Sequence, residues 1–340
     1  MGGIHEMGRL LRQRLGMLIF VLFGVTVGTF VMSHVIPGDP AQIMAGPHAS
    51  AQTIAAIRHR LGLDQPLLVQ YWDYMKGLLQ GNLGISIRTQ DPVAKDLIAF
   101  FPATLELVLY AFLVAIVVGI PLGVLSAVKK GTWWDYVARV FAIGGVSIPV
   151  FWSGLLLILI FYAKVGWLPA SGRLDVTLPP PPTITGLYTV DSALTGYWAD
   201  FFNSLWHLVL PAIALSYVQL SVIMRQVRSS MLEVLSKEFM LTGRANGLGR
   251  MFLIIRYGLR NAMIPTITVI GLSFGSLLGG AVVTETVFDW PGMGNYVVQS
   301  IGSLDFPAIM GFTVVIAIAY VLINLLVDLL HYALDPQIRR

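Results

Sequence analysis

The sequence predicts an all-α integral membrane protein with six transmembrane helices and a small helical region outside the membrane. Hydrophobic residues make up 56% of the 340 residues and charged residues 12%, whereas charged residues form about a quarter of an ordinary soluble domain. Six apolar runs each reach the roughly 20 residues that a helix needs to cross a bilayer. Between the runs, Lys and Arg are distributed unevenly, as in multi-pass membrane proteins.

The six apolar runs define the order of elements along the chain. The first run is too long for the hydrophobic part of a signal peptide, about 7 to 15 residues, so we expect it to stay as a helix. In the second and third runs, Gly119, Pro121, Gly144, Gly145 and Pro149 predict close helix packing or a kink. The predicted spans are residues 15–36, 102–128, 137–163, 204–224, 262–288 and 308–330.

The basic residues predict which ends lie in the cytosol. With both ends inside, 15 of the 22 Lys and Arg residues fall in cytoplasmic segments, which is the orientation that the positive-inside rule favours. Residues 1–14 and 332–340 are then the cytoplasmic ends, and residues 101–331 form a core of five helices. The net charge of +4 therefore reflects topology, and nucleic acid is not an expected partner.

Residues 37–100 are predicted to form a small extracytoplasmic cap. The sequence IPGDP at 36–40 should end the first helix, because proline cannot continue one. Ser50 is a suitable N-cap for a helix over 51–61. A second helix is expected over 67–79, where apolar residues recur at helical spacing.

The most basic segment, residues 225–261, separates the fourth and fifth runs. It contains seven Lys and Arg residues but only two acids, and its apolar residues recur at intervals of three and four. A glycine-rich turn over 243–249 divides it. The pattern predicts a helix-turn-helix that stands in the cytosol.

Motifs for enzymatic chemistry are missing from the sequence. It has no phosphate-binding G-x-x-x-x-G-K-[ST] loop and no G-x-S-x-G elbow. The six histidines are scattered, and cysteine is absent, so we expect no metal site. We therefore expect no catalytic, metal-binding or cofactor-binding residue in this chain.

Short motifs along nearly the whole chain resemble the permease subunits of ABC importers, in the dipeptide, oligopeptide, opine and nickel branch. The chain is most similar to the first, B-type, dipeptide permease. In place of the Glu-Ala-Ala triplet that begins the coupling loop of the superfamily stand Leu241, Thr242 and Gly243. The matching motifs are IPGDP (36–40), GNLGIS (81–86), FPATLEL (101–107), RSSMLEVL (228–235), LRNAMIP (259–265), TETVFDWPGMG (284–294) and NLLVDLL (324–330).

The resemblance implies a fold like that of type I importer permeases, in a bacterial inner membrane. It implies a heterodimer with a second permease, two ATPase subunits that hold ATP and Mg, and a periplasmic or lipid-anchored solute-binding protein. Tyr71 and Trp72 would bind the solute-binding protein. Glu285, Trp290, Pro291 and Gly292 would lie along the translocation path or at its outer gate. Residues expected to couple to the ATPase are Glu238, Leu241, Thr242, Gly243, Arg244, Ala245, Asn246, Gly247 and Leu248.

Several questions stay open at the level of sequence. A secondary transporter, or an assembly or scaffold protein without a transport path, is the alternative function. The former would require inverted repeats and ion-binding groups at mid-membrane, which we do not find. If the chain belongs to an importer, di- or oligopeptides are the first expectation for its substrate, ahead of opines, glutathione or nickel. Gly247 is the position in the coupling loop where a substitution should affect coupling most clearly, because a positive φ or a close partner backbone would each require glycine.

Overall fold

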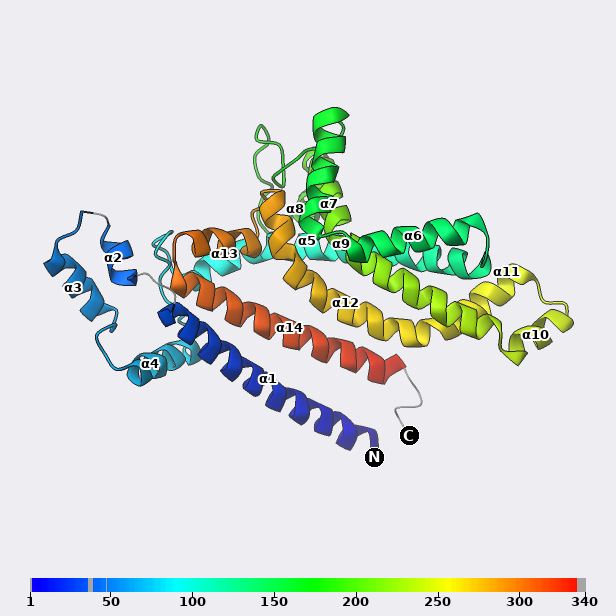
Figure 1. Cartoon of the computed structure of the whole chain (residues 1–340), viewed down its shortest axis with the longest axis horizontal. Helices are drawn as coiled ribbons and strands as arrows, with labels where there is room; N and C mark the ends of the chain where they lie inside the picture. Colours follow the sequence, from blue (N-terminus) through cyan, green and yellow to red (C-terminus); the bar gives the residue numbers. More distant parts are fainter. Residues whose placement is uncertain (1, 36–38, 47, 335–340) are drawn as a thin grey trace. The chain divides into compact units, whose positions relative to one another are not determined.

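The computed structural model describes residues 2–35, 39–46 and 48–334, and it is helical throughout (Figure 1). Among these residues there is no β-strand, only one isolated bridge between Ile85 and Pro92. Part of the IPGDP motif and most of the expected 332–340 tail lie outside the described residues. The chain forms two compact units, one of residues 1–102 and 291–322 and one of residues 103–290 and 323–340.

Most helices follow one another with short connections, but longer loops precede α5 and α8. They are α1 (Gly2–Val35), α2 (Pro40–Ala45), α3 (Ala51–Arg60), α4 (Leu67–Leu79), α5 (Val93–Val128), α6 (Trp133–Ser147), α7 (Val150–Leu157), the π-helical η1 (Ile158–Lys164), α8 (Tyr188–Thr195), α9 (Trp198–Leu235), α10 (Glu238–Ala245), α11 (Arg250–Phe252), the π-helical η2 (Leu253–Leu259), α12 (Arg260–Val287), α13 (Met293–Gly302) and α14 (Phe306–Leu334).

The first unit contains both helices that the sequence predicts in region 37–100. Helix α3 begins after Ser50, whose hydroxyl accepts a hydrogen bond from the backbone N–H of Thr53 at 3.2 Å. Helix α4 has the predicted bounds. The core of this unit joins the start of α5 to α13 and α14 through the buried residues Val93, Leu97, Met293, Tyr296 and Ala308.

The second unit is built around α9, against which α6, α7, α8 and α12 pack. Small residues bring neighbouring helices close to it. A Cβ added at Gly123 of α5 would lie 2.7 Å from the carbonyl oxygen of Met224, and one at Gly145 of α6 would lie 2.8 Å from that of Tyr217. Such close backbone approach is typical of helices packed in membranes.

In the part of the chain that the structure describes, five helices are long and apolar enough to cross a membrane, and a bent pair can supply a sixth crossing. The third predicted span, 137–163, is therefore not one continuous helix. It divides into α6 and α7–η1, which meet at 112°. Pro149 disfavours helical backbone at the preceding residue, and Ile148 is extended, with φ −90° and ψ 124°. The predicted kink is thus a sharp break.

Candidate functional site

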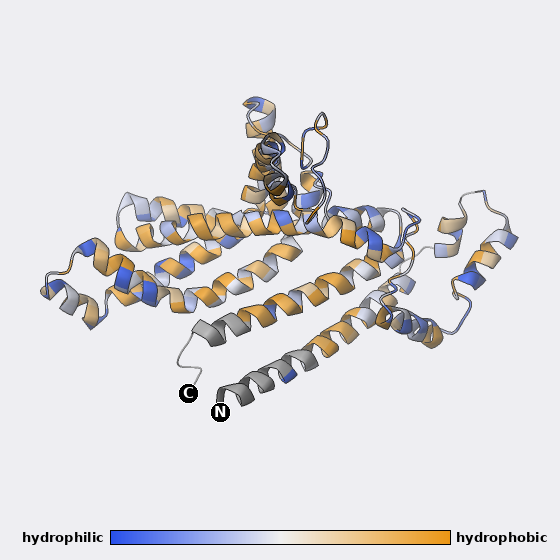
Figure 2. Cartoon of the chain, turned by 180° about the vertical axis from the view of Figure 1, so that it is seen from behind, coloured by the Kyte–Doolittle hydropathy of each residue, from blue (hydrophilic) through white to orange (hydrophobic). Residues whose placement is uncertain are grey.

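The segment 225–261 forms the predicted helix-turn-helix at one end of α9 and α12 (Figure 1). Helix α9 ends at Leu235, α10 follows after two residues, and a turn over 246–249 leads into α11 and η2. Strongly hydrophilic positions occur at α10 and α11, whereas most of α12 is coloured as hydrophobic (Figure 2). The segment is thus a polar extension of an apolar pair of helices.

Gly247 ends α10 in a Schellman motif. Its φ is +78°, a left-handed conformation that costs other residues roughly 1–2 kcal/mol. The N–H of Gly247 bonds to the carbonyl of Arg244 at 3.0 Å, and that of Leu248 to the carbonyl of Gly243 at 3.1 Å, which is the pair of bonds that defines the motif. Of the two reasons for glycine at position 247 that the sequence leaves open, the structure shows the positive φ. A Cβ built at Gly247 would have no atom within 4 Å, so the positive φ, and not a lack of space, requires glycine.

Gly243 allows α10 to lie directly on η2. A Cβ at this position would be 2.6 Å from a methyl group of Leu253. Met240 and Leu253 are almost fully buried beside it, so α10 is fixed to the helix that continues into α12. A displacement of α10 would therefore move η2 with it.

The outer side of α10 and its turn is exposed and partly apolar. Leu241 of α10 is 58% exposed and Met251 of α11 is 66% exposed, whereas Phe239, 44% exposed, borders the hollow between α10 and η2. Of the nine residues expected to couple to an ATPase, Gly243 is buried and the other eight are exposed. The segment thus presents a mixed apolar and basic surface on a rigid base.

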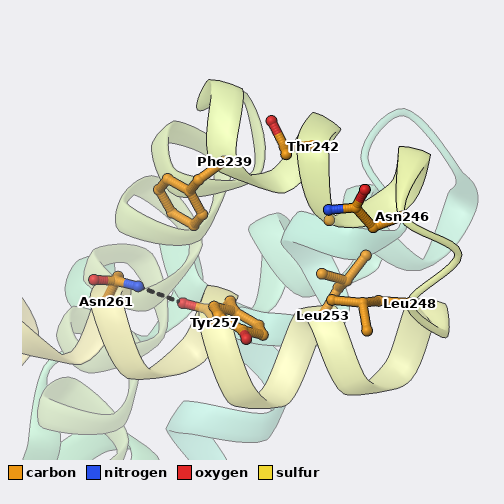
Figure 3. A pocket seen from close by; sticks show the side chains of 8 residues that line it. Phe239, Thr242, Asn246, Leu248, Leu253, Tyr257 and Asn261 are labelled. Carbon is orange, nitrogen blue, oxygen red and sulfur yellow. Dashed lines mark hydrogen bonds between the residues drawn. The ribbon is translucent and has the colours of Figure 1, made fainter.

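A hollow of about 450 Å³ lies between α10 and η2 (Figure 3). Phe239, Thr242 and Asn246 border it from α10 and its end, and the Asn261 amide donates to the carbonyl of Tyr257 at 2.7 Å on the opposite side. Its lining is Phe239, Thr242, Gly243, Asn246, Leu248, Leu253, Tyr257 and Asn261.

The four residues expected at an outer gate divide between the two compact units. Glu285 and Trp290 belong to the second unit, where both are buried, and the indole N–H of Trp290 donates to the carbonyl of Ala103 at 2.8 Å. Pro291 and Gly292 begin the part of the first unit that contains α13. The assignment of the four residues to an outer gate stays a prediction.

A buried ion pair holds the loop before α8 on α5. The Arg173 guanidinium donates to Glu106 at 2.5 Å and to the carbonyl of Gly186 at 2.9 Å. The other carboxylate oxygen of Glu106 accepts from the N–H and the hydroxyl of Thr189. Arg173 also lies 3.7 Å from the centre of the Tyr188 ring. Nothing in the sequence links Glu106 to Arg173, which lies 67 residues away.

A second buried carboxylate joins α5, α6 and α9. Asp135 accepts hydrogen bonds from the Ser126 hydroxyl at 2.6 Å and from the Gly131 N–H at 3.1 Å. Two nitrogens of the Arg228 guanidinium also donate to it, at 2.8 and 3.1 Å. Arg228 begins the RSSMLEVL motif, yet nothing in the sequence links it to Asp135, 93 positions earlier. The cluster positions the end of α9 that leads into α10.

The two residues expected to bind a solute-binding protein face different surroundings. Tyr71 packs on α1, where its hydroxyl lies 3.1 Å from that of Thr26, and Trp72 is 70% exposed. Within the described ranges, no three His, Cys, Asp or Glu residues are grouped as a metal site would require.

Two family models match the chain. The binding-protein-dependent transport system inner membrane component matches residues 119–340, and the corresponding N-terminal component matches residues 7–108. The chain is 54% identical to the probable D,D-dipeptide transport system permease protein DdpB of Escherichia coli (strain K12), with 97% of each chain covered.

More distant relatives are similar over the same length. The dipeptide transport system permease protein DppB of Alkalihalophilus pseudofirmus is 45% identical, over 96% of this chain and 98% of its own. The glutathione transport system permease protein GsiC of Escherichia coli O6:H1 is 38% identical, over 96% and 97%. Similarity thus extends through both compact units and through segment 225–261.

Proposed function

We propose that this chain, which belongs to the inner membrane components of binding-protein-dependent transport systems, carries dipeptides or closely related short peptides as a permease subunit of an ABC importer. Identity over nearly the whole chain supports this substrate class, since it is 54% to a D,D-dipeptide permease and 45% to a dipeptide permease, but 38% to a glutathione permease. The alternatives of a secondary transporter and a scaffold protein are not favoured.

Segment 225–261 is the part of the chain that we assign to coupling with an ATPase. The observation that carries this assignment is the exposed, partly apolar surface of α10. Helix α10 packs on η2 at Gly243 and ends at Gly247. A rigid helix end with apolar side chains can fill a groove on a partner and transmit its movement. Glu238, Leu241, Thr242, Arg244, Ala245, Asn246 and Leu248 would supply the remaining contacts.

The proposed assembly contains a second permease subunit as a heterodimer, two ATPase subunits and a solute-binding protein. ATP and Mg would bind to the ATPase subunits, so this chain would hold no nucleotide or metal. Both termini would lie in the cytosol, in agreement with the count of basic residues. Glu285, Trp290, Pro291 and Gly292 remain proposed residues of the path or its outer gate.

Exchange of Gly247 tests the coupling assignment. Gly247→Val places a β-branched residue at φ +78°, where it is strongly disfavoured, and should distort the turn after α10. Gly249→Val is the matched control, because Gly249 has φ −59° and open space around it. We expect Gly247→Val to reach the membrane but to lose most dipeptide uptake and ATPase copurification, while Gly249→Val and Lys237→Ala keep both. Arg244→Ala and Asn246→Ala should show intermediate losses.

The outcomes separate coupling from transport class. Full uptake and full ATPase binding for Gly247→Val would remove the coupling assignment but leave the importer intact. Absence of any ATPase or second permease in complexes purified with the unaltered chain would instead contradict the importer. Competition of labelled dipeptide uptake by glutathione and by D,D-dipeptides would decide the substrate class.

A further inference from the structure

Helix α4 has an apolar face wider than the part that contacts protein. At 100° per residue, Tyr71 and Tyr74 lie on one side of this face and Leu68, Trp72 and Leu79 on the other. Tyr71 and Tyr74 pack against α1. Leu68, Trp72 and Leu79 are 85%, 70% and 84% exposed. The apolar face thus continues past the protein contact into open space.

The contact with α1 fixes the depth of α4. Tyr71 meets Thr26 through a hydroxyl pair at 3.1 Å, and its ring lies 5.2 Å from that of Phe30. Both partners belong to the apolar stretch Gly16–Val35, the part of α1 that can cross a membrane. Thr26 lies roughly 13 Å before the end of α1, at 1.5 Å per residue. Tyr71 therefore reaches α1 inside the hydrocarbon layer.

The polar side of α4 contacts the end of α1, beyond the residues that Tyr71 contacts. Gln70 bonds to the ring of His34, in the last turn of α1, at 3.1 Å. The exposed residues Asp73 and Lys76 follow Gln70 on the same side of α4 at helical spacing. Polar contacts thus lie at the end of the span, and aromatic contacts lie deeper. This is the order in which a membrane interface places water and acyl chains.

We propose that α4 lies in the membrane interface of the leaflet where α1 ends, with Leu68, Trp72 and Leu79 in contact with lipid acyl chains. Interfacial helices bury their apolar face about 5–10 Å below the headgroups, which agrees with a helix that touches Phe30. Lys76 lies beside the apolar stripe and can extend its ammonium group to the headgroups.

This assignment replaces the expectation that Tyr71 and Trp72 bind the solute-binding protein. Tyr71 is occupied by α1, and Trp72 faces lipid. The region between α1 and α5 is then held to the membrane surface by α4. The inference requires only that α1 spans the membrane, so it does not depend on the transported solute or on the coupling assignment.

Spin labels on α4 in the assembled transporter test the proposal. The chain has no cysteine, so one residue at a time can be labelled, with cysteine-free partner subunits and lipid vesicles. Labels at Leu68→Cys, Trp72→Cys and Leu79→Cys should collide with oxygen, which dissolves in lipid, several-fold more than with a water-soluble nickel chelate. Labels at Asp73→Cys and Lys76→Cys, the matched controls, should show the reverse.

Each outcome distinguishes a different environment. Strong collision with the nickel chelate at Leu68, Trp72 and Leu79 would mean that the stripe faces water and would overturn the proposal. Weak collision with both reagents would mean that a protein subunit covers the stripe, which would also overturn it. Leu68 and Leu79 have almost no protein contacts to lose, so their labels report on the environment even if a label at Trp72 disturbs the helix.

Discussion

Arg173 shows how one side chain can hold a long loop on a transmembrane helix. It is buried with Glu106, and the remaining acceptor positions of that carboxylate are occupied by Thr189. A buried carboxylate requires such compensation, because an ion removed from water without a partner costs several kcal/mol. The pair therefore makes the position of the loop depend on α5.

Removal of one partner of this pair should destabilise the protein markedly. We expect Arg173→Met to lower the free energy of unfolding by about 3–5 kcal/mol, because Glu106 would remain buried without its cation. Thermal unfolding of the purified complex in detergent measures the loss. The double variant Glu106→Gln with Arg173→Met should recover part of it, and a double variant less stable than Arg173→Met would contradict a pairwise role.

Thr189 is the control within the same cluster. Thr189→Val removes the hydroxyl bond at 2.7 Å but keeps the backbone N–H bond at 2.8 Å to the same oxygen of Glu106. The expected loss is about 1 kcal/mol, the usual contribution of one hydrogen bond. A loss as large as that of Arg173→Met would show that the hydroxyl, rather than the ion pair, carries the stability of the cluster.

At the scale of elements, Asp135 joins the α5–α6 connection to α9 just before the helix-turn-helix. The double contact with Arg228 is the link between them. We expect Arg228→Met to weaken the link between α9 and the α5–α6 turn and to lower uptake more than it lowers ATPase binding, since α10 itself is unchanged. Uptake rate and ATPase copurification, measured on the same membranes, provide the comparison. Equal losses of both would favour general misfolding.

Helix α8 is preceded by a loop that one carboxylate holds in place. Burial raises the pKa of Asp191, but hydrogen bonds from Ile184, Thr185 and Gly186 lower it more, so its pKa lies below the ordinary 3.8. A depressed pKa stabilises the folded loop above the unfolded pKa, and that stabilisation is lost as pH falls through the folded value.

The loop should therefore open only in acid. We expect amide exchange at Thr185 and Gly186, corrected for the intrinsic effect of pH, to stay slow at neutral pH and to rise once pH falls below about 4. Asp191→Asn should exchange rapidly at neutral pH as well. A variant with unchanged protection would mean that the backbone around α8, and not the carboxylate, holds the loop.

At the scale of the whole molecule, the orientation of the chain can be read with single cysteines, since the natural sequence has none. Val176 is fully exposed in the loop before α8, and Ser236 is exposed between α9 and α10. An impermeant thiol reagent added outside intact cells should label Val176→Cys and not Ser236→Cys. The opposite pattern would invert the proposed topology.

Local features of the fold follow from the sequence because their causes are local. The Ser50 cap and the apolar spacing of 67–79 lie within the helices that they define, and both predictions agree with the structure. Pro149 likewise indicates a kink in advance. The 112° between α6 and α7–η1 does not follow from that proline alone, since packing against other helices sets the angle.

Long-range features could not be obtained in this way. Arg173 and Glu106 are 67 positions apart, and Arg228 and Asp135 are 93 apart, so no periodicity relates them. The candidate coupling site lies between these extremes. The glycine at the end of α10 is a local signal for the end of a helix. The close packing of Gly243 on Leu253 depends instead on how two helices meet, which the sequence does not show.

The π-helical segment η2 lies between the turn of the helix-turn-helix and α12, and it affects how the two are rotated relative to each other about the helix axis. A π-helical turn holds one residue more than an α-helical turn, so such segments behave as single-residue insertions. Deletion of one residue between Leu253 and Leu259 would allow a continuous α-helix and would leave the N-terminal side facing nearly the same way, because the π-helical segment absorbs the extra residue. Deletion of one residue from the regular α-helix of α12 would instead rotate everything on its N-terminal side by about 100°. Residue count, and not only side-chain identity, therefore decides which side of α10 this membrane protein turns toward a partner.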